Sequence, residues 1–162
     1  MIIIGIDPGT ARIGWGVVSA IAGTVKAISY GLIETPKDEP PEVRLLTISR
    51  ALDSIIEKYH PEAMAVEELF FTKNVTTAIS VGQARGVILL SGAKQNIPIT
   101  SYSPRNIKST ITGTGGAEKK QIQFMVAKLL CLPSPPKPDD VADALAIALT
   151  HAFSYKMKAV GH

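Results

Sequence analysis

The sequence predicts an α/β domain built on a mixed sheet. An apolar, isoleucine-rich run opens the chain at residues 1–6, two strand-like segments follow it directly, and helical patterns then alternate with short apolar runs. The length of 162 residues is typical of one domain, and 46% hydrophobic residues are ample for a core. We therefore expect a single domain over residues 1–158 and a short tail at 159–162.

The first half of the chain shows strand and turn signals around one helix. The expected strands are residues 1–6, 14–19, 25–34 and 63–66. Turn chemistry at residues 7–10 joins the first two strands, so the chain opens as a meander. Between the third and fourth strands, helical periodicity places five aliphatic side chains on one face: Leu45, Ile48, Leu52, Ile55 and Ile56. Pro61 marks the end of this helix.

The second half contains a fifth strand and most of the expected helices. These elements are a helix at 75–95, a strand at 98–102, a short helix beginning at Ser103-Pro104, and helices at 118–130 and 140–155. A glycine-rich loop separates the second and third of these helices at 112–116. Gly82 and Gly86 lie inside the first helix, where each costs ~1 kcal/mol relative to alanine. With Ala78 one turn earlier, they form a small-residue face that permits close approach of another backbone.

Composition excludes several classes of protein. A single cysteine, Cys131, excludes a disulfide framework and a cysteine-rich zinc module. No apolar run approaches the ~20 residues that a membrane span requires. The N-terminus reaches Asp7 with no basic region before it, which does not fit a signal peptide. We therefore expect a cytoplasmic protein with no membrane partner.

The modest net charge of +3 conceals an uneven distribution of charge. Residues 1–68 contain 6 Lys and Arg against 10 Asp and Glu, whereas residues 69–128 contain 8 against a single acid, Glu118. A basic segment of this kind suits a polyanion, because Lys and Arg displace the counterions of phosphates. The alternative is a solvated surface on which basic residues cluster by chance.

Acidic residues follow two of the apolar strands. Asp7 ends the first strand, and Glu67 and Glu68 end the fourth. Burial of a carboxylate is costly without a cation or hydrogen bonds, so acids at the ends of core strands are candidates for a functional site. The alternatives are an Asx-turn at Asp7 and a strand that has simply reached solvent at Glu67 and Glu68.

Three aspartates open the last expected helix. Asp139 can serve as its cap. Asp140 and Asp143 then lie on one face, about 5–6 Å apart at Cβ, and that face continues through Ala144 and Ile147. Two like charges repel unless a cation lies between them. The spacing therefore favours metal ligation over capping for Asp140 and Asp143.

These four or five carboxylates have no paired histidines beside them. Hard oxygen ligands select Mg²⁺ or Mn²⁺ rather than zinc. Such a cluster suits phosphodiester hydrolysis with two metal ions ~3.5–4 Å apart. No serine–histidine or cysteine–histidine arrangement competes, because His60 precedes a proline, His162 is terminal, and His151, about two helical turns beyond Asp143, is interpreted as structural.

Five motifs occur in order along almost the whole chain. They are Gly5-Ile6-Asp7-Pro8-Gly9, Glu67-Glu68-Leu69-Phe70 leading to Lys73-Asn74, Gly82-Gln83-Ala84-Arg85-Gly86, Ala117-Glu118-Lys119-Lys120-Gln121-Ile122-Gln123, and Asp140-Val141-Ala142-Asp143-Ala144-Leu145-Ala146-Ile147-Ala148. Together they resemble the RuvC family, the bacterial Holliday-junction resolvases or crossover junction endodeoxyribonucleases. The resemblance implies a ribonuclease-H-like fold, a mixed five-stranded sheet flanked by helices, in a homodimer that acts on four-way DNA junctions during recombination and repair. It also implies nicks with 5′-phosphate and 3′-hydroxyl ends.

The resemblance also assigns residues to roles. The implied catalytic and metal-binding carboxylates are Asp7, Glu67, Asp140 and Asp143, which would hold two Mg²⁺ ions, with Mn²⁺ as a substitute. The choice of Glu67 over Glu68 comes from the resemblance alone. The implied DNA-binding residues are Phe70, Lys73, Asn74, Lys108, Lys119 and Lys120. Among these, Phe70 is expected against a base near the crossover, and Lys108 and Lys119 near the scissile phosphate. The implied dimer interface is Ala78, Gly82 and Gly86, and a branch-migration motor complex is an implied partner.

Two other classes of function remain as alternatives. An actin-like ATPase or sugar kinase would explain residues 7–10 with Gly14 and Gly16 as a phosphate loop, but it needs a second lobe and a second loop that 162 residues cannot hold. The loop at 112–116 lacks the spacing of a Walker or dinucleotide loop. A non-catalytic DNA-binding module accounts for the basic segment and leaves the carboxylates unexplained.

Overall fold

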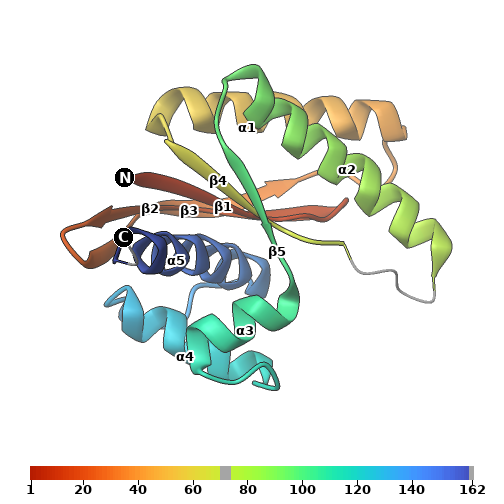
Figure 1. Cartoon of the computed structure of the whole chain (residues 1–162). Helices are drawn as coiled ribbons and strands as arrows, with labels where there is room; N and C mark the ends of the chain where they lie inside the picture. The colour runs from red at the N-terminus through yellow and green to blue at the C-terminus, as the bar shows by residue number, and fades with distance from the viewer. Residues whose placement is uncertain (70–73, 161–162) are drawn as a thin grey trace.

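A five-stranded sheet separates two helical layers in the computed structural model, which describes residues 1–69 and 74–160 (Figure 1). The strands are β1 (Ile2–Asp7), β2 (Arg12–Ile21), β3 (Thr24–Glu34), β4 (Ala63–Glu67) and β5 (Ile99–Tyr102). Their order across the sheet is β3-β2-β1-β4-β5. The first three strands are antiparallel neighbours, whereas β4 is parallel to β1 and β5 is parallel to β4. The predicted meander followed by parallel strands is confirmed.

The helices cover both faces of this sheet (Figure 1). They are α1 (Pro41–Tyr59), α2 (Val75–Lys94), α3 (Pro104–Thr112), α4 (Lys119–Leu129) and α5 (Asp139–Val160). Helices α1 and α2 pack on one face and on each other, while α5 packs against β1 and β2 on the other face. Helices α3 and α4 then pack against α5. Within the described residues, no helix is both long enough and apolar enough to cross a membrane.

Strand β1 is buried on both faces, which explains its continuous apolar sequence. Ile4 and Ile6 belong to the core beneath α1 and α2, whereas Ile3 belongs to the core beneath α5. The predicted apolar face of α1 packs into the first of these cores, where Ile48 and Leu52 are almost completely buried. Burial of this kind supplies most of the free energy that holds an amphipathic helix in place.

Two glycines allow α5 to lie directly on the sheet. A Cβ atom at Gly5 would overlap the backbone carbonyl of Ala144, and one at Gly14 would overlap the carbonyl of Asp140. Gly14 is also the register partner of Asp7 across β1 and β2. The close approach of α5 therefore places its first turn beside the carboxyl end of β1.

The ends of the later helices differ slightly from the expected spans. Helix α4 begins one residue after its expected start, because Glu118 is its N-cap and its backbone N–H donates to Gln121 Oε1 at 2.8 Å. The expectation that Asp139 precedes and caps α5 is wrong. Asp139 is the first residue of α5, and its carboxylate pairs with Lys119 instead. Helix α5 also continues to Val160, beyond its expected end at residue 155.

Candidate active site

Acidic residues from three elements meet at one edge of the sheet. Asp7 is the last residue of β1 and Glu67 is the last residue of β4. These strands are parallel neighbours with Ile6 opposite Val66, so both carboxyl ends lie side by side. The first turn of α5 adds Asp140, and Asp143 follows one turn later. The carboxyl edge of a sheet with parallel strands is a common place for a binding site.

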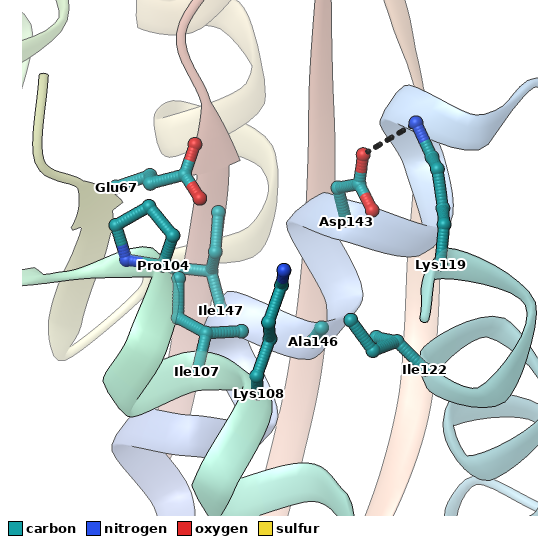
Figure 2. A pocket seen from close by; sticks show the side chains of 9 residues that line it. All are labelled: Glu67, Pro104, Ile107, Lys108, Lys119, Ile122, Asp143, Ala146 and Ile147. Atoms are coloured by element: carbon teal, nitrogen blue, oxygen red, sulfur yellow. Dashed lines mark ion pairs between the residues drawn. The ribbon is translucent and has the colours of Figure 1, made fainter. Parts of the chain in front are cut away.

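A pocket of about 210 Å³ opens at this edge. Glu67 and Asp143 face its interior together with two lysines, Lys108 from α3 and Lys119 from the start of α4 (Figure 2). In Figure 2 the Lys108 ammonium points into the space between Glu67 and Asp143. Apolar side chains complete the lining: Pro104, Ile107, Ile122, Ala146 and Ile147. The pocket thus joins acidic and basic groups over an apolar base.

Burial and mutual repulsion raise the pKa of three acids in and beside this pocket; Glu67 and Asp143 line it, whereas Asp7 does not. Burial, followed by the negative charges of Glu67, Asp143 and Asp140, raises the pKa of Asp7 to about 8. Burial and the charge of Asp143 raise the pKa of Glu67 to about 7, although Lys108 and Lys119 act in the opposite direction. Burial also raises the pKa of Asp143, against the attraction of Lys119. With all of its carboxylates ionised, the site would carry more negative charge than its two lysines neutralise.

Two cations already contact the acids of α5. Lys119 Nζ lies 3.4 Å from a carboxylate oxygen of Asp139 and 3.4 Å from one of Asp143. On the other side, Arg12 Nε lies 3.5 Å from an oxygen of Asp140. The sequence does not identify Arg12 as a site residue, because its partner lies far along the chain and a single arginine at the start of β2 forms no motif.

The donor set fits a hard divalent cation. In residues 1–69 and 74–160, no three His, Cys, Asp or Glu side chains lie close enough together to hold an ion without rearrangement. Burial, and after it the charge of neighbouring carboxylates, raises the pKa of both Asp7 and Glu67, so each carboxylate would be stabilised by a further positive charge. All of the donors are oxygens, which suits Mg²⁺ or Mn²⁺. A cation among them would relieve the repulsion.

The structure separates the two adjacent glutamates. Glu67 lines the pocket, whereas Glu68 is exposed and its backbone N–H donates to the carbonyl of Tyr102 at 2.9 Å. His151, interpreted from the sequence as structural, shares a 3.0 Å hydrogen bond with the Tyr102 hydroxyl through Nδ1. His151 does not line the pocket.

Four of the residues expected to contact DNA lie within the described part of the chain: Asn74, Lys108, Lys119 and Lys120. Lys108 and Lys119 lie in the pocket, and Lys120 is exposed beside it, where it borders a second groove with Phe124. Asn74 is the N-cap of α2, and its Oδ1 accepts from the Thr77 backbone N–H at 3.3 Å. The expected DNA-binding residues Phe70 and Lys73 lie outside the described residues.

The small residues expected at a dimer interface lie on α2. Ala78 and Gly82 are half-buried and Gly86 is exposed. A Cβ atom at Gly86 would meet no other atom within 4 Å, and one at Gly82 would meet only Leu69, in ordinary contact. Gly82 and Gly86 are therefore not required for packing within the described part of the chain, whereas Gly92 near the end of α2 is buried against Met64 and Ile99.

Comparisons with known proteins identify the family. The family model described as crossover junction endodeoxyribonuclease RuvC matches residues 3–151. A crossover junction endodeoxyribonuclease RuvC of Desulforamulus reducens is 55% identical over 94% of this chain and 93% of its own length. One from Moorella thermoacetica is 53% identical, over 94% and 91%.

Solved structures agree with these relatives. The structure of Thermus thermophilus RuvC matches with a TM-score of 0.90 and 36% identity, over 98% of this chain and 97% of that chain. The same protein in complex with Holliday junction substrate gives a TM-score of 0.93 at 36% identity, over 98% and 96%. The predicted ribonuclease-H-like fold is thereby confirmed. On its sequence and its fold alike, the chain belongs to the RuvC family of crossover junction endodeoxyribonucleases.

Proposed function

We propose that this chain is a Mg²⁺-dependent endonuclease that resolves four-way DNA junctions in recombination and repair. It would do so by paired nicks that leave 5′-phosphate and 3′-hydroxyl ends. The observation that carries this proposal is the gathering of carboxylates from β1, β4 and α5 at the sheet edge, where Glu67 and Asp143 share a pocket with two lysines. Relatives at more than 50% identity bear the name of this activity, and a solved relative at 36% identity is bound to a Holliday junction.

Four carboxylates would hold the metal, with two ions in each site and Mn²⁺ as a substitute. These are Asp7, Glu67, Asp140 and Asp143. Bound divalent ions would supply an activated water and a counter-charge for the leaving oxygen. The carboxylates come from two strands and a helix that pack directly on one another, so the fold holds their backbones in fixed relative positions.

The two pocket lysines have a complementary task. Lys108 points into the pocket between Glu67 and Asp143, and Lys119 lines the pocket on the far side of Asp143, with which its ammonium is paired (Figure 2). In this position their ammonium groups can bind a phosphate that enters the pocket and stabilise the charge that develops on it. Lys119 is paired with Asp139 and Asp143 in the protein alone. Its ion pair with Asp139 would keep it beside the pocket if Asp143 bound a cation.

A homodimer would present two such pockets to two strands of the junction. Helix α2 exposes large apolar side chains, with Val75 69%, Ile79 59% and Leu90 58% accessible, on a helix that also carries Gly82 and Gly86. An exposed apolar face with small residues at its centre is suited to an isologous contact with a second copy. A branch-migration motor complex, as implied by the family, stays a prediction, as does action in the cytoplasm.

Phe70 extends this proposal to the base near the crossover. In the sequence it follows Leu69, which is exposed two residues after the end of β4, and it precedes the start of α2. Stacking on an unpaired base is worth ~1–3 kcal/mol. We therefore expect Phe70→Ala to reduce junction cleavage far more than it reduces the melting temperature. A large fall in melting temperature with wild-type cleavage at low temperature would place Phe70 in the core instead.

The experiment that separates the candidate functions uses the wild-type protein with a labelled four-way junction. Incubation with Mg²⁺ should give paired nicks whose ends a ligase can seal, whereas incubation with a chelator should give none. A linear duplex of the same sequence is the matched control and should stay intact. Junction binding without any nick would support a DNA-binding module, and ATP turnover without nicking would support the actin-like alternative.

A further inference from the structure

One arginine of α2 reaches across to the sheet edge that carries Glu67. Arg85 Nε donates to the backbone carbonyl of Glu67 at 3.3 Å, and Arg85 Nη2 donates to Ser101 Oγ at 2.7 Å. The side chain is half-buried. A single guanidinium thus joins three elements, because Glu67 ends β4 and Ser101 belongs to β5.

This contact lies at the point where β4 stops being held by the sheet. The pairing of β4 with β5 ends at Glu67 opposite Tyr102, with one further hydrogen bond from the Glu68 N–H to the Tyr102 carbonyl. The bond from Arg85 therefore acts on the last paired residue of the strand. It fixes the backbone from which the Glu67 side chain extends into the pocket.

Packing of α2 on the sheet does not require this arginine. Ala84 and Ile88, on either side of Arg85 along the helix, are completely buried in the core between α1, α2 and the sheet. The planar guanidinium has rigidly placed donors that satisfy two acceptors at once, which a lysine ammonium on a flexible stem does less well. The Arg85 side chain is thus suited to fixing the position of the β4 backbone rather than to holding α2 on the sheet.

We propose that Arg85 is a positioning residue for Glu67. Its guanidinium holds the end of β4 against β5 and α2, so that the Glu67 carboxylate is placed to bind a divalent cation together with Asp7. Arg85 lies next to Gly86 and one turn from Gly82. Its hydrogen bond to the Glu67 carbonyl therefore links the backbone of Glu67 to this part of α2. The inference rests on the proposed function, because it assigns Glu67 to a metal site.

Direct metal binding tests this inference without any measurement of cleavage. Mn²⁺ would be titrated into protein freed of metal with a chelator, and free Mn²⁺ would be followed by electron paramagnetic resonance. Loss of a side chain that orients a metal ligand costs roughly 10-fold or more in affinity. We expect Arg85→Met to raise the Mn²⁺ dissociation constant about 10-fold and Arg85→Lys to raise it less. The exposed arginine of α1 gives the matched control, Arg50→Met, which should leave it unchanged.

A second background distinguishes positioning from general destabilisation. In a Glu67→Ala protein the ligand that Arg85 places is gone, so adding Arg85→Met should weaken Mn²⁺ binding no further. If the two substitutions act additively, or if Arg85→Met alone leaves Mn²⁺ binding intact, the inference is wrong. Should Arg85→Met fail to fold, Ser101→Ala removes one of the two partners and should still weaken binding measurably. Wild-type protein that binds no Mn²⁺ would overturn the proposed function itself.

Discussion

Replacement of Asp7 by asparagine should stabilise the metal-free protein while abolishing its activity. Asp7 ends β1 among the other acids of the site, and burial with their negative charge raises its pKa to about 8. In the unfolded chain this carboxyl group ionises near pH 4, whereas in the folded protein it is still largely protonated at pH 7.5. Ionisation at pH 7.5 therefore stabilises the unfolded chain relative to the folded protein. Asp7→Asn removes the ionisable group from both states and keeps its shape.

The magnitude follows from the shift in pKa. The pKa of this carboxyl group is near 4 in the unfolded chain. At pH 7.5, about 3.5 pH units higher, its ionisation therefore stabilises the unfolded chain by on the order of 5 kcal/mol, at about 1.36 kcal/mol per unit. Asp7 is only half-buried, so water can relax around the ionised carboxylate, and we expect about 2–3 kcal/mol of this to be observed at pH 7.5. At pH 5 the same reasoning leaves under about 1 kcal/mol.

The direction of the pH dependence is a further check. The folded protein binds the Asp7 proton more tightly than the unfolded chain does, so wild-type stability should fall as pH rises from about 4 through about 8. The assay is urea unfolding of chelator-treated protein at pH 5 and 7.5. Glu68→Gln, an exposed carboxylate outside the pocket, is the control and should change stability by less than about 0.5 kcal/mol. An Asp7→Asn protein that is no more stable than wild type at pH 7.5, or equally stabilised at both pH values, would refute the reasoning.

Three further sets of variants test the lysines, the packing of α5 and the dimer. Lys108→Ala and Lys119→Ala should each reduce the slope of log binding constant against log salt concentration by about one unit and should slow single-turnover cleavage. Lys128→Ala is the control and should leave the cleavage rate near wild type. Equal small effects in all three variants would contradict a role for Lys108 and Lys119 in the site. Gly14→Ala should cost about 3 kcal/mol or more in urea unfolding, because its Cβ would overlap the α5 backbone; a cost under about 1 kcal/mol would contradict the close approach. Gly86→Arg should halve the solution mass measured by light scattering without loss of folding, since the position faces open space in one chain; an unchanged dimer would contradict the proposed interface.

The sequence predicted the fold because each element has a local signal. The apolar run of β1 and the aliphatic face of α1 reflect burial on two sides and on one side respectively, and both were confirmed. Element ends were less predictable. Asp139 was expected to cap α5, but it is the first residue of that helix. Its carboxylate forms an ion pair with Lys119, some 20 residues earlier in the chain.

The site depends on contacts between distant parts of the chain, which local patterns do not encode. Nothing in the residues alone distinguished Glu67 from Glu68, because only the position of the last β4 residue at the pocket separates them. Arg12 and Arg85 were likewise missed as members of the site. Their partners are Asp140, far along the chain, and a backbone carbonyl, which has no sequence signature at all.

The central claim is that Asp7, Glu67, Asp140 and Asp143 form a metal-dependent nuclease site. The most direct test is single-turnover cleavage of a four-way junction in Mg²⁺ by the Asn or Gln variant of each, with junction binding measured in parallel. Glu68→Gln, next to Glu67 but exposed, is the matched control. The account predicts that all four variants fold and bind the junction but do not cleave it, while Glu68→Gln retains most of the wild-type rate. Cleavage by Glu67→Gln with loss of activity in Glu68→Gln would contradict the assignment of Glu67 as the metal ligand. Loss of junction binding in all four variants would indicate that the four carboxylates have only a structural role.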